Sequence, residues 1–420
     1  MKRRAFFKTS FLSAYAAAFV PCSVFGRNGN VPPSDRIYVG AIGTGGRFLR
    51  ALLPSFYQQD DVRIVAVCDC WKERREEAKA NVDMRYENED CIAYRFHEEI
   101  LERDDIDAVI LATGDRWHAV LSALAAKAGK DVYSEKPYCL TIAEGRQLVE
   151  VAKQQNIIWQ CGTQRHSNPD YLYVIDVVRQ GKIGKLHTIS TKLGSWGGNG
   201  EAKPEAIPEG FDYDRWLGQS PWRRYSPVSV DLWRNHWDTG GGVIADMGPH
   251  MYDIAQMATQ SGEAIPIHYQ GTAVFPQSGF SNVPFEWDVR AKYENGVQLL
   301  TKMGEKSIRF IGDEGWIEIV DATGEIRSEP QSLSAQSAPT PFHYNRMGEH
   351  VRDFLDGMRS RRLPVCHPEI AHRAHTIVHA SNICLRLGRA VNWDYRRECF
   401  VDDDDANRML SRPMRAPWEI

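Results

Sequence analysis

Short apolar runs separated by amphipathic stretches mark the first third of the chain. Three of these runs, residues 37–42, 62–67 and 108–112, consist mostly of apolar side chains, as the buried strands of a parallel sheet do. The stretches between them have helical spacing. This alternation predicts a doubly wound parallel sheet of the α/β class, with crossover helices between its strands.

Two helices in this region carry N-terminal signals. Asp115 is expected to cap a helix whose apolar positions recur every three or four residues and which ends near Gly129. Thr141 and Glu144 have the spacing of a capping box, for a helix that runs to about Gln155. Residues 157–161 are then expected to form the last strand of this sheet.

The pattern changes beyond about Arg165, where longer strand-like segments begin. The segments expected as strands are 186–193, 286–293, 297–303 and 307–311. Turn sequences at 294–296 and 312–315 join several of them as hairpins. This half is therefore expected to be an α+β domain built on an open, mainly antiparallel sheet.

The C-terminal part begins with a polar stretch, 328–341, that is expected to be a surface loop. Two helices are expected to follow, the first with Val351, Phe354, Leu355 and Met358 on one side. The tail from Trp393 onward is expected to be irregular.

Length and composition indicate two globular domains. At 420 residues, 43% of them hydrophobic, the chain exceeds one ordinary core. We place the domains at 31–165 and 166–420, with the C-terminal helices and tail in the second. The formal net charge is −4 and no long basic run follows the N-terminus, so nucleic acid is not an expected partner.

Residues 1–30 resemble an export leader. Arg3 and Arg4 precede a short apolar stretch at 11–20 and then small residues, as in a twin-arginine signal. The apolar stretch is too short to span a bilayer, so no membrane span is expected. Pro21 directly before Cys22 does not favour lipid attachment at that cysteine. We expect an exported, periplasmic protein.

A glycine-rich turn follows the first expected strand. Gly43, Thr44, Gly45, Gly46 and Arg47 lead from this strand into a helix, which brings backbone N–H groups and a helix N-terminus to a pyrophosphate. Asp69 ends the second strand, near the distance at which an acidic side chain meets the ribose hydroxyls of NAD. The pattern predicts a dinucleotide site.

The same residues bear on the choice of cofactor. NAD is favoured over NADP because Asp69 would repel a ribose phosphate, although Lys72 and Arg74 lie close enough to weaken this preference. Phe48 stands where the fingerprint has its third glycine. A bulky ring there would push helix and strand apart unless the turn differs from the standard form.

Two further motifs carry candidate chemical groups. Lys136 lies in the sequence Glu135-Lys136-Pro137 at the carboxyl end of an expected strand, where open α/β sheets bind ligands. Pro137 is a position for a cis bond. The glycines at 240–242 precede Asp246 and His250, which a helix would place one turn apart on one face.

Together these motifs resemble those of the glucose-fructose oxidoreductase and inositol dehydrogenase (Gfo/Idh/MocA) family, most closely its exported bacterial branch. The resemblance covers essentially the whole chain after the leader. It implies a Rossmann domain followed by an open-sheet domain, a nicotinamide cofactor, and hydride exchange with a secondary alcohol of a sugar, cyclitol or glycoside. Lys136, Asp246 and His250 would be its chemical residues.

The resemblance also implies a mechanism and neighbouring residues. His250 would remove the hydroxyl proton, Asp246 would orient His250, and Lys136 would steady the developing alkoxide. Imidazole suits this role because its pKa lies near neutrality. The groups expected beside the cofactor, in addition to the glycine-rich turn and Asp69, are Thr113, His118, Glu135 and Lys136.

Substrate contacts are expected from the second half of the chain. Tryptophans at 196, 216, 222, 233 and 237 crowd into one segment, and aromatic faces pack against sugar rings, although core packing also accounts for such residues. Arg234 and Trp237 adjoin the glycine loop at 240–242. The full expected substrate set is Lys136, Gln164, Arg234, Trp237 and His250.

No metal site is expected from these patterns. His372, His375 and His379 would align on one helix face, but no nearby cysteine or carboxylate clearly completes a shell. The acidic run 402–405 lacks the alternating ligands of a calcium loop and is expected to be a solvated turn. The cysteines show neither a disulfide framework nor zinc-ribbon spacing.

Three functions stay open at this point. An exported enzyme works where free NAD is scarce, so we expect a tightly held cofactor used in a redox-neutral conversion or in cleavage of a glycosidic bond. An ordinary NAD-dependent dehydrogenase is the first alternative, and a non-catalytic protein that binds NAD or sugar is the second. Edge strands in the second sheet favour a homo-oligomer.

Overall fold

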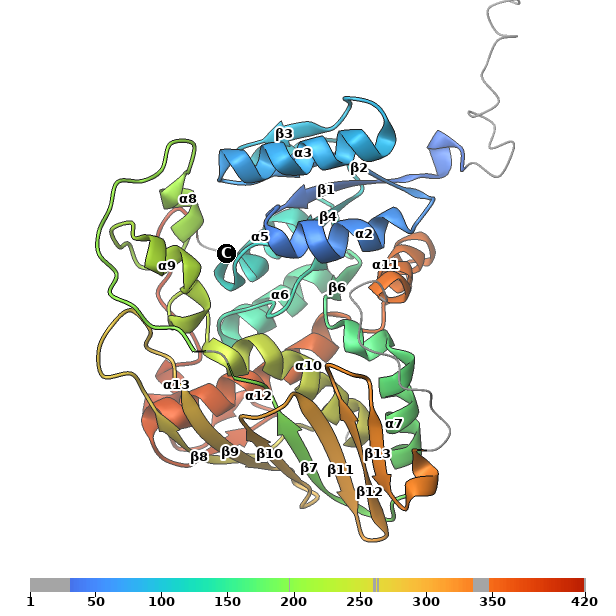
Figure 1. The fold of residues 1–420 in the computed structure, drawn as a ribbon, viewed down its shortest axis with the longest axis vertical. Coiled ribbons are helices and arrows are strands. Elements are labelled where there is room, and N and C mark those ends of the chain that lie inside the picture. Colours follow the sequence, from blue (N-terminus) through green and yellow to red (C-terminus); the bar gives the residue numbers. More distant parts are fainter. Residues whose placement is uncertain (1–30, 196, 260–261, 263, 335–346, 419–420) are drawn as a thin grey trace, which may run out of the picture.

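The protein contains two sheets, each covered by helices (Figure 1). The structure is a computed structural model that describes residues 31–195, 197–259, 262, 264–334 and 347–418. The predicted leader at 1–30 and part of the loop predicted at 328–341 lie outside the described residues.

The first sheet is parallel and has six strands in the order β3-β2-β1-β4-β5-β6. The strands are β1 (Ile37–Ile42), β2 (Val62–Cys68), β3 (Ile92–Tyr94), β4 (Ala108–Leu111), β5 (Asp131–Ser134) and β6 (Trp159–Cys161). The order reverses between β1 and β4, which is where such sheets form a ligand crevice. The predicted Rossmann sheet is confirmed, and only the three-residue β3 was not expected.

Helices join the strands of this sheet. They are α3 (Lys72–Tyr86), α4 (His97–Leu101), α5 (Asp115–Lys127) and α6 (Ile142–Gln154). Thr141 caps α6 as expected, because its hydroxyl accepts the N–H of Glu144 at 3.1 Å. The expectation for α5 was wrong: Gly114 is its N-cap without a side-chain cap bond, and Asp115 is a buried residue of the first turn.

The helix after β1 departs from the standard geometry at Phe48. A π-helical turn, η4 (Phe48–Leu52), leads directly into α2 (Leu53–Tyr57). The Phe48 side chain is fully buried in the first core. The wider turn therefore accommodates a ring at the position where the fingerprint has glycine.

The second sheet has nine strands in the order β13-β12-β11-β7-β10-β9-β8-β14-β15. Seven of them are β7 (Leu186–Lys192), β8 (His268–Val274), β9 (Glu286–Lys292), β10 (Gln298–Lys302), β11 (Ser307–Gly312), β12 (Gly315–Val320) and β13 (Ile326–Glu329). Both predicted hairpins form, β9–β10 and β11–β12. The sheet is mainly antiparallel as expected, with one parallel pair, β7 and β10.

The C-terminal tail is more regular than expected. It forms β14 (Val391–Asp394), β15 (Cys399–Phe400) and α13 (Asp404–Arg408). Strand β14 extends the second sheet by pairing with β8, and Trp393 and Phe400 are buried. The acidic run is the start of α13, where Asp403 caps the helix through the N–H of Ala406. The sequence prediction missed these two strands because they depend on contacts with other strands: β14 pairs with β8, and β15 pairs with β14.

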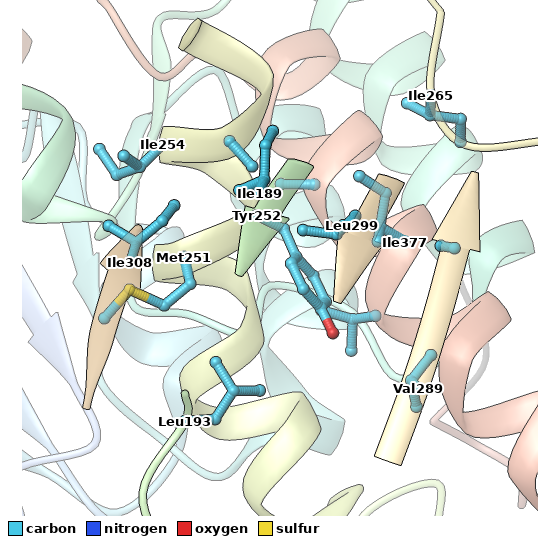
Figure 2. Close-up of a cluster of buried hydrophobic side chains, with 14 of the residues drawn as sticks. Ile189, Leu193, Met251, Tyr252, Ile254, Ile265, Val289, Leu299, Ile308 and Ile377 are labelled. Carbon is cyan, nitrogen blue, oxygen red and sulfur yellow. The ribbon is translucent and has the colours of Figure 1, made fainter. Parts of the chain in front are cut away.

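Three helices pack on one face of the second sheet: α7 (Pro169–Arg179), α10 (Gly242–Thr259) and α12 (Pro368–Leu387). Figure 2 shows Ile308, Leu299 and Val289 of the sheet meeting Met251 and Tyr252 of α10. Alternation along the strands favours this face, because the inward Val289 and Ile308 are followed by the polar Arg290 and Arg309. The core thus holds α10 firmly against the sheet.

One helix from late in the chain packs on the first domain. Helix α11 (Gly348–Ser360) buries Val351, Phe354, Leu355 and Met358, the stripe expected from the sequence, in the core beside β1 and α2 (Figure 1). The remaining short elements are η3 (Pro33–Asp35), η5 (Gln164–Ser167), α8 (Tyr213–Leu217), α9 (Pro227–Asp231), η6 (Trp233–Asn235) and η7 (Gln331–Leu333). Among the described residues, no helix has the length and apolarity needed to cross a membrane.

Truncating the second core is expected to destabilise the protein. Ile308→Ala removes a fully buried side chain and should cost about 2–5 kcal/mol of the free energy of unfolding. Met84→Ala on α3, where the side chain is 72% exposed, is the control and should change it by less than about 0.5 kcal/mol. Denaturant titration of both variants tests this, and equal midpoints would contradict the packing described.

Candidate active site

The glycine-rich turn after β1 is shaped by Gly43. Its φ is +84°, and a Cβ atom there would come within 2.7 Å of the backbone of Ala112 and Thr113. Only glycine fits such a position without strain. The turn thereby brings the N-terminus of the following helix to the carboxyl edge of the first sheet, where N–H groups can face an anion.

Asp69 lies directly beside this turn. Its Oδ2 accepts the N–H of Thr44 at 2.9 Å, and its Oδ1 accepts the N–H of Trp71 at 2.9 Å. The carboxylate is thus held at the end of β2, in the position expected for a contact with a cofactor ribose. It also fastens the glycine-rich turn.

A cavity of about 470 Å³ opens over these residues. Gly43, Gly45, Gly46, Arg47, Asp69 and Thr113 of the expected cofactor set line it. Its wall is strongly cationic, with the guanidinium-bearing residues Arg47, Arg50, Arg74, Arg95, Arg116, Arg215 and Arg234. The glycine turn, the carboxylate and this cationic wall suit the pyrophosphate and ribose of a dinucleotide.

The segment around α8 closes one side of this cavity. Arg95 pairs with Asp212 at 2.7 Å, and the indole of Trp117 donates to the backbone carbonyl of Arg215 at 3.0 Å. Trp216 and Trp233 line the cavity as well. Sequence analysis named Trp216 and Trp233 as candidate sugar contacts but missed Arg95 and Arg215, because no motif marks them and only the folded chain brings α8 over the first sheet.

Glu135 connects the cavity to the interior. Its Oε1 accepts Arg47 Nη2 at 2.7 Å and Gln164 Nε2 at 3.1 Å. Gln164 is buried and also donates to the hydroxyl of Tyr133. Both residues therefore lie behind the cavity wall, and they support Arg47 at its surface.

Lys136 is joined to α10 of the second domain. Its ammonium group is 2.9 Å from Asp246 Oδ1 and 2.8 Å from the Asp246 carbonyl oxygen. Arg234 Nε approaches the same Oδ1 at 3.3 Å. Burial opposes ionisation of Asp246, but Lys136 and Arg234 outweigh it and hold its pKa below the usual range. The peptide bond between Lys136 and Pro137 is cis, as predicted.

His250 lies one turn further along α10. It is 4% exposed, and its Nδ1 has no hydrogen-bond partner among the residues that the structure describes. Burial lowers its pKa well below the usual value, and the charges of Arg165, Lys136 and Arg47 lower it further. The imidazole is therefore neutral, and its lowered pKa makes it a weaker base than the near-neutral imidazole that the sequence predicted.

Among the described residues, Asp246 and His250 do not form the expected hydrogen bond. The two side chains do lie on one helix, but the Asp246 carboxylate faces Lys136 and Arg234 instead. Two cations attract this carboxylate more strongly than a neutral imidazole can. Asp246 thus positions the lysine, while Nδ1 of His250 stays without a partner.

The other expected neighbours divide into two groups. Arg234 lines the cavity, whereas His118 lies beneath the lysine loop with its Nδ1 2.7 Å from the carbonyl oxygen of Pro137. Trp237 lies away from the cavity lining, between the guanidinium groups of Arg386 and Arg412. Of the remaining tryptophans, Trp222 is 62% exposed and Trp196 is outside the described residues.

Asp115 is an additional titratable group near the lysine. It is buried, and burial raises its pKa to about 7, while Arg234 and Lys136 partly offset that effect. The sequence assigned it only to a helix cap. No sequence pattern indicated this burial, because it results from the packing of α5 in the folded chain.

The three histidines of α12 bond within the protein. His372 Nδ1 lies 3.0 Å from the Tyr138 hydroxyl, His375 Nε2 accepts the N–H of Tyr138 at 3.2 Å, and His379 Nε2 is 3.5 Å from Cys139 Sγ. These partners belong to the segment that follows Pro137, and His372 Nε2 also lies 3.0 Å from Glu398 Oε1. This stripe thus supports the lysine loop from below.

Comparison with known proteins identifies the family. The model described as the oxidoreductase family, NAD-binding Rossmann fold, matches residues 37–163, and the model for the C-terminal alpha/beta domain of the same family matches residues 180–420. Together they cover both sheets and Lys136, Asp246 and His250, whereas Gln164 lies between the two matched ranges.

Two curated relatives are similar over part of the chain. A glycosyl hydrolase family 109 protein of Solibacter usitatus is 32% identical over 191 residues, which are 40% of this chain and 41% of that protein. A second such protein, of Shewanella sp. strain ANA-3, is 31% identical over 205 residues, 44% of each. The chain thus matches about two fifths of the length of these relatives.

Solved structures share the fold over most of the chain. An aldose-aldose oxidoreductase from Caulobacter crescentus complexed with glycerol has a TM-score of 0.66 at 20% identity, over 85% of this chain and 99% of that one. The WlbA dehydrogenase from Bordetella pertussis, in complex with NADH and UDP-GlcNAcA, has 0.64 at 16%, over 86% and 99%. A 3-ketoreductase from Actinomadura kijaniata with NADP and TDP-benzene has 0.62 at 19%, over 84% and 98%.

The family comparison and the structure lead to the same assignment, because the matched residues contain the Rossmann sheet and the glycine-rich turn beside Asp69. The chain belongs to the Gfo/Idh/MocA oxidoreductase family, as an enzyme that depends on a nicotinamide cofactor.

Proposed function

We propose that this enzyme transfers a hydride between its nicotinamide cofactor and a secondary hydroxyl carbon of a sugar or glycoside. The observation that carries this proposal is the ion pair between Lys136 and Asp246. Asp246 lies one turn before the buried, neutral His250 in α10. Such a pairing offers both a fixed positive charge and a proton acceptor at one reacting oxygen.

The chain's own residues have distinct roles in this proposal. His250 accepts the hydroxyl proton, because its imidazole is uncharged and its Nδ1 is unpaired among the described residues. Lys136 stabilises the negative charge that develops on the oxygen, and Asp246 positions Lys136. The nicotinamide supplies the hydride acceptor. Arg234, at the cavity surface and bonded to Asp246, is the proposed substrate contact.

We propose NAD as the cofactor. Asp69 is held at the end of β2 by two backbone N–H groups, where a second negative charge on the ribose would be repelled. Arg74 and Arg95 line the same cavity and would favour such a phosphate. Structures with the same fold contain NADH or NADP. Measuring the affinity of this enzyme for NAD and for NADP shows whether repulsion by Asp69 or attraction by Arg74 and Arg95 decides the choice.

The second candidate is redox-neutral cleavage of a glycosidic bond. The observation that favours it is the similarity to proteins named glycosyl hydrolase family 109, over about two fifths of their length. A hydride taken from the sugar would then return to it after the bond is broken. Export, which the sequence of residues 1–30 predicts, would favour such a cycle, because a cofactor retained on the enzyme needs no external oxidant.

We also propose that the enzyme is a homo-oligomer. The sheet face opposite α10 carries exposed polar side chains such as Arg290 and Lys292, and its outer edges are the short strands β13 and β15. A second copy covering this sheet would remove both the open face and its edges from water. Light scattering of the purified protein tests the assembly.

Replacing the proposed base should reduce turnover but not cofactor binding. His250→Gln is expected to lower kcat about 10²–10⁴-fold with sugars or glycosides that reduce the bound cofactor, at unchanged affinity for NAD. His268→Gln, on the surface of β8, is the matched control and should keep full activity. Stopped-flow absorbance of the nicotinamide measures both, and undiminished turnover in His250→Gln would refute the assignment.

Retained cofactor is the second expectation. Protein purified without added nucleotide should contain about one NAD or NADH per chain. Gly43→Ala should lose it, because the added Cβ meets the backbone of Ala112, whereas Gly129→Ala, also at positive φ but in open space, is the matched control. Nucleotide-free protein that works only with added NAD and releases NADH would contradict a redox-neutral cycle.

The raised pKa of Asp115 predicts a pH-dependent stability. The folded carboxyl keeps its proton up to about pH 7, whereas the carboxyl of the unfolded chain loses it near pH 3.8, so stability should decline as the pH rises from about 4 to 7. Asp115→Asn should remove this decline and gain at most about 4 kcal/mol over the wild type above pH 7. Chemical denaturation across pH 4–8, with the exposed Asp60→Asn as background, tests it, and parallel curves would contradict it.

A further inference from the structure

A second cluster of chemically active side chains lies further along α10, about two helical turns beyond Asp246. His166 of η5, Asp253 of α10 and Cys366, which precedes α12, come from three separate elements. One donor atom from each lies within 4.8 Å of the others. None of the three lines the arginine-lined cavity.

The cluster is buried but incompletely bonded. Asp253 is 1% exposed; its Oδ2 is 2.8 Å from His166 Nδ1, whereas its Oδ1 has no partner among the described residues. Cys366 is fully buried, with Sγ 2.9 Å from the Thr163 hydroxyl. A buried carboxylate oxygen without a donor is costly, so the site calls for a further positive group.

An ion pair between His166 and Asp253 explains only one of the two Asp253 carboxylate oxygens and leaves the position of Cys366 unexplained. Burial lowers the pKa of His166, but the Asp253 charge outweighs it and raises that pKa well above the usual value. The resulting imidazolium satisfies one carboxylate oxygen. It leaves Asp253 Oδ1 unsatisfied, and it gives no reason for a thiol at the same point.

A cysteine nucleophile is also disfavoured by the geometry. A surface hollow reaches the cluster and is lined by His166 and Asp253, together with Arg179, Gln256 and Arg373, but not by Cys366. A substrate in that hollow would meet the imidazole and the carboxylate while the sulfur stays covered. The thiol is therefore placed to bind something inside the cluster.

We propose that His166, Asp253 and Cys366 bind a zinc-class divalent metal ion. An imidazole nitrogen, a carboxylate oxygen and a thiolate are the donors that Zn²⁺ takes in proteins, and three of them leave one tetrahedral position for water from the hollow. Ligands of a tetrahedral zinc ion lie about 3.3 Å apart, so the imidazole and carboxylate need to separate by about 0.5 Å. Binding releases the thiol proton and the imidazole proton, and it therefore weakens as the pH falls.

The ion would fix the position of the helix that carries the candidate catalytic residues. Asp253 is three residues after His250 in α10, while His166 follows β6 and Cys366 precedes α12. One ion would tie these three segments together about two helical turns along α10 from the contact between Lys136 and Asp246. It would act by positioning α10 and has no contact with the cofactor.

Metal content and cobalt spectroscopy of the full chain test this proposal. Protein purified without chelator, then stripped and reloaded, is expected to take up one Zn²⁺ or one Co²⁺ per chain. The cobalt form should show a thiolate-to-cobalt charge-transfer band and the visible bands of a four-coordinate ion. Zn²⁺ should raise the Tm of the stripped protein, and a chelator should reverse the rise.

Matched variants assign the ligands. Cys366→Ser should abolish the charge-transfer band, and Asp253→Asn should weaken Co²⁺ binding at least about tenfold. Cys384→Ser replaces a buried cysteine outside the cluster, whose thiol faces the Arg389 carbonyl, and should leave the band and the affinity unchanged.

The wild-type measurement stands even if a variant fails to fold. A stripped wild-type chain that takes up no Zn²⁺ or Co²⁺ at micromolar concentration would overturn the proposal. So would a charge-transfer band that survives in Cys366→Ser. These readouts involve no turnover, so they are independent of whether the enzyme acts on sugars or glycosides.

Discussion

The contact between Lys136 and Asp246 is the interaction on which the rest of the site depends. Lys136 follows β5 of the first sheet and Asp246 belongs to α10, which packs on the second sheet. Both side chains are largely buried, and removing one partner of such a pair leaves an uncompensated charge worth about 3–5 kcal/mol. This single pair therefore sets where the helix with His250 stands relative to the cofactor crevice.

Burial and charge act together on the groups around this pair. The arginine-lined cavity favours anionic ligands, whereas the same cations, together with burial, keep His250 uncharged. Burial also favours the protonated form of Asp115. The interior of the site thus combines His250 and Asp115, whose neutral forms burial favours, with the charged Lys136–Asp246 pair, while arginines line its outer side. This arrangement suits the proposed hydride transfer from an alcohol.

Much of this architecture follows from local sequence patterns. The apolar runs of β1, β2 and β4 and the turn at Gly43 are visible without a structure, because buried parallel strands need continuous apolar residues and the turn needs glycine. Asp246 and His250 could be placed on one helix face by their spacing. What they touch could not: Asp246 turns to Lys136 and Arg234, which are distant in sequence.

The features that sequence analysis missed all arise from long-range packing. Trp393 becomes part of a strand only beside β8, and Arg215 reaches the cofactor cavity only when α8 folds over the first sheet. His166, Asp253 and Cys366 have no spacing that a metal motif would show, since three separate elements supply them. Trp237 adjoins the glycine loop in sequence, yet two arginines hold it away from the cavity lining.

A crystal structure with bound nicotinamide cofactor and a sugar ligand tests the central claim most directly. The account predicts the nicotinamide ring beside the lysine loop, with one sugar hydroxyl about 3 Å from both Lys136 Nζ and a ring nitrogen of His250. A nicotinamide ring seated away from Lys136, with α10 turned from the dinucleotide crevice, would contradict it.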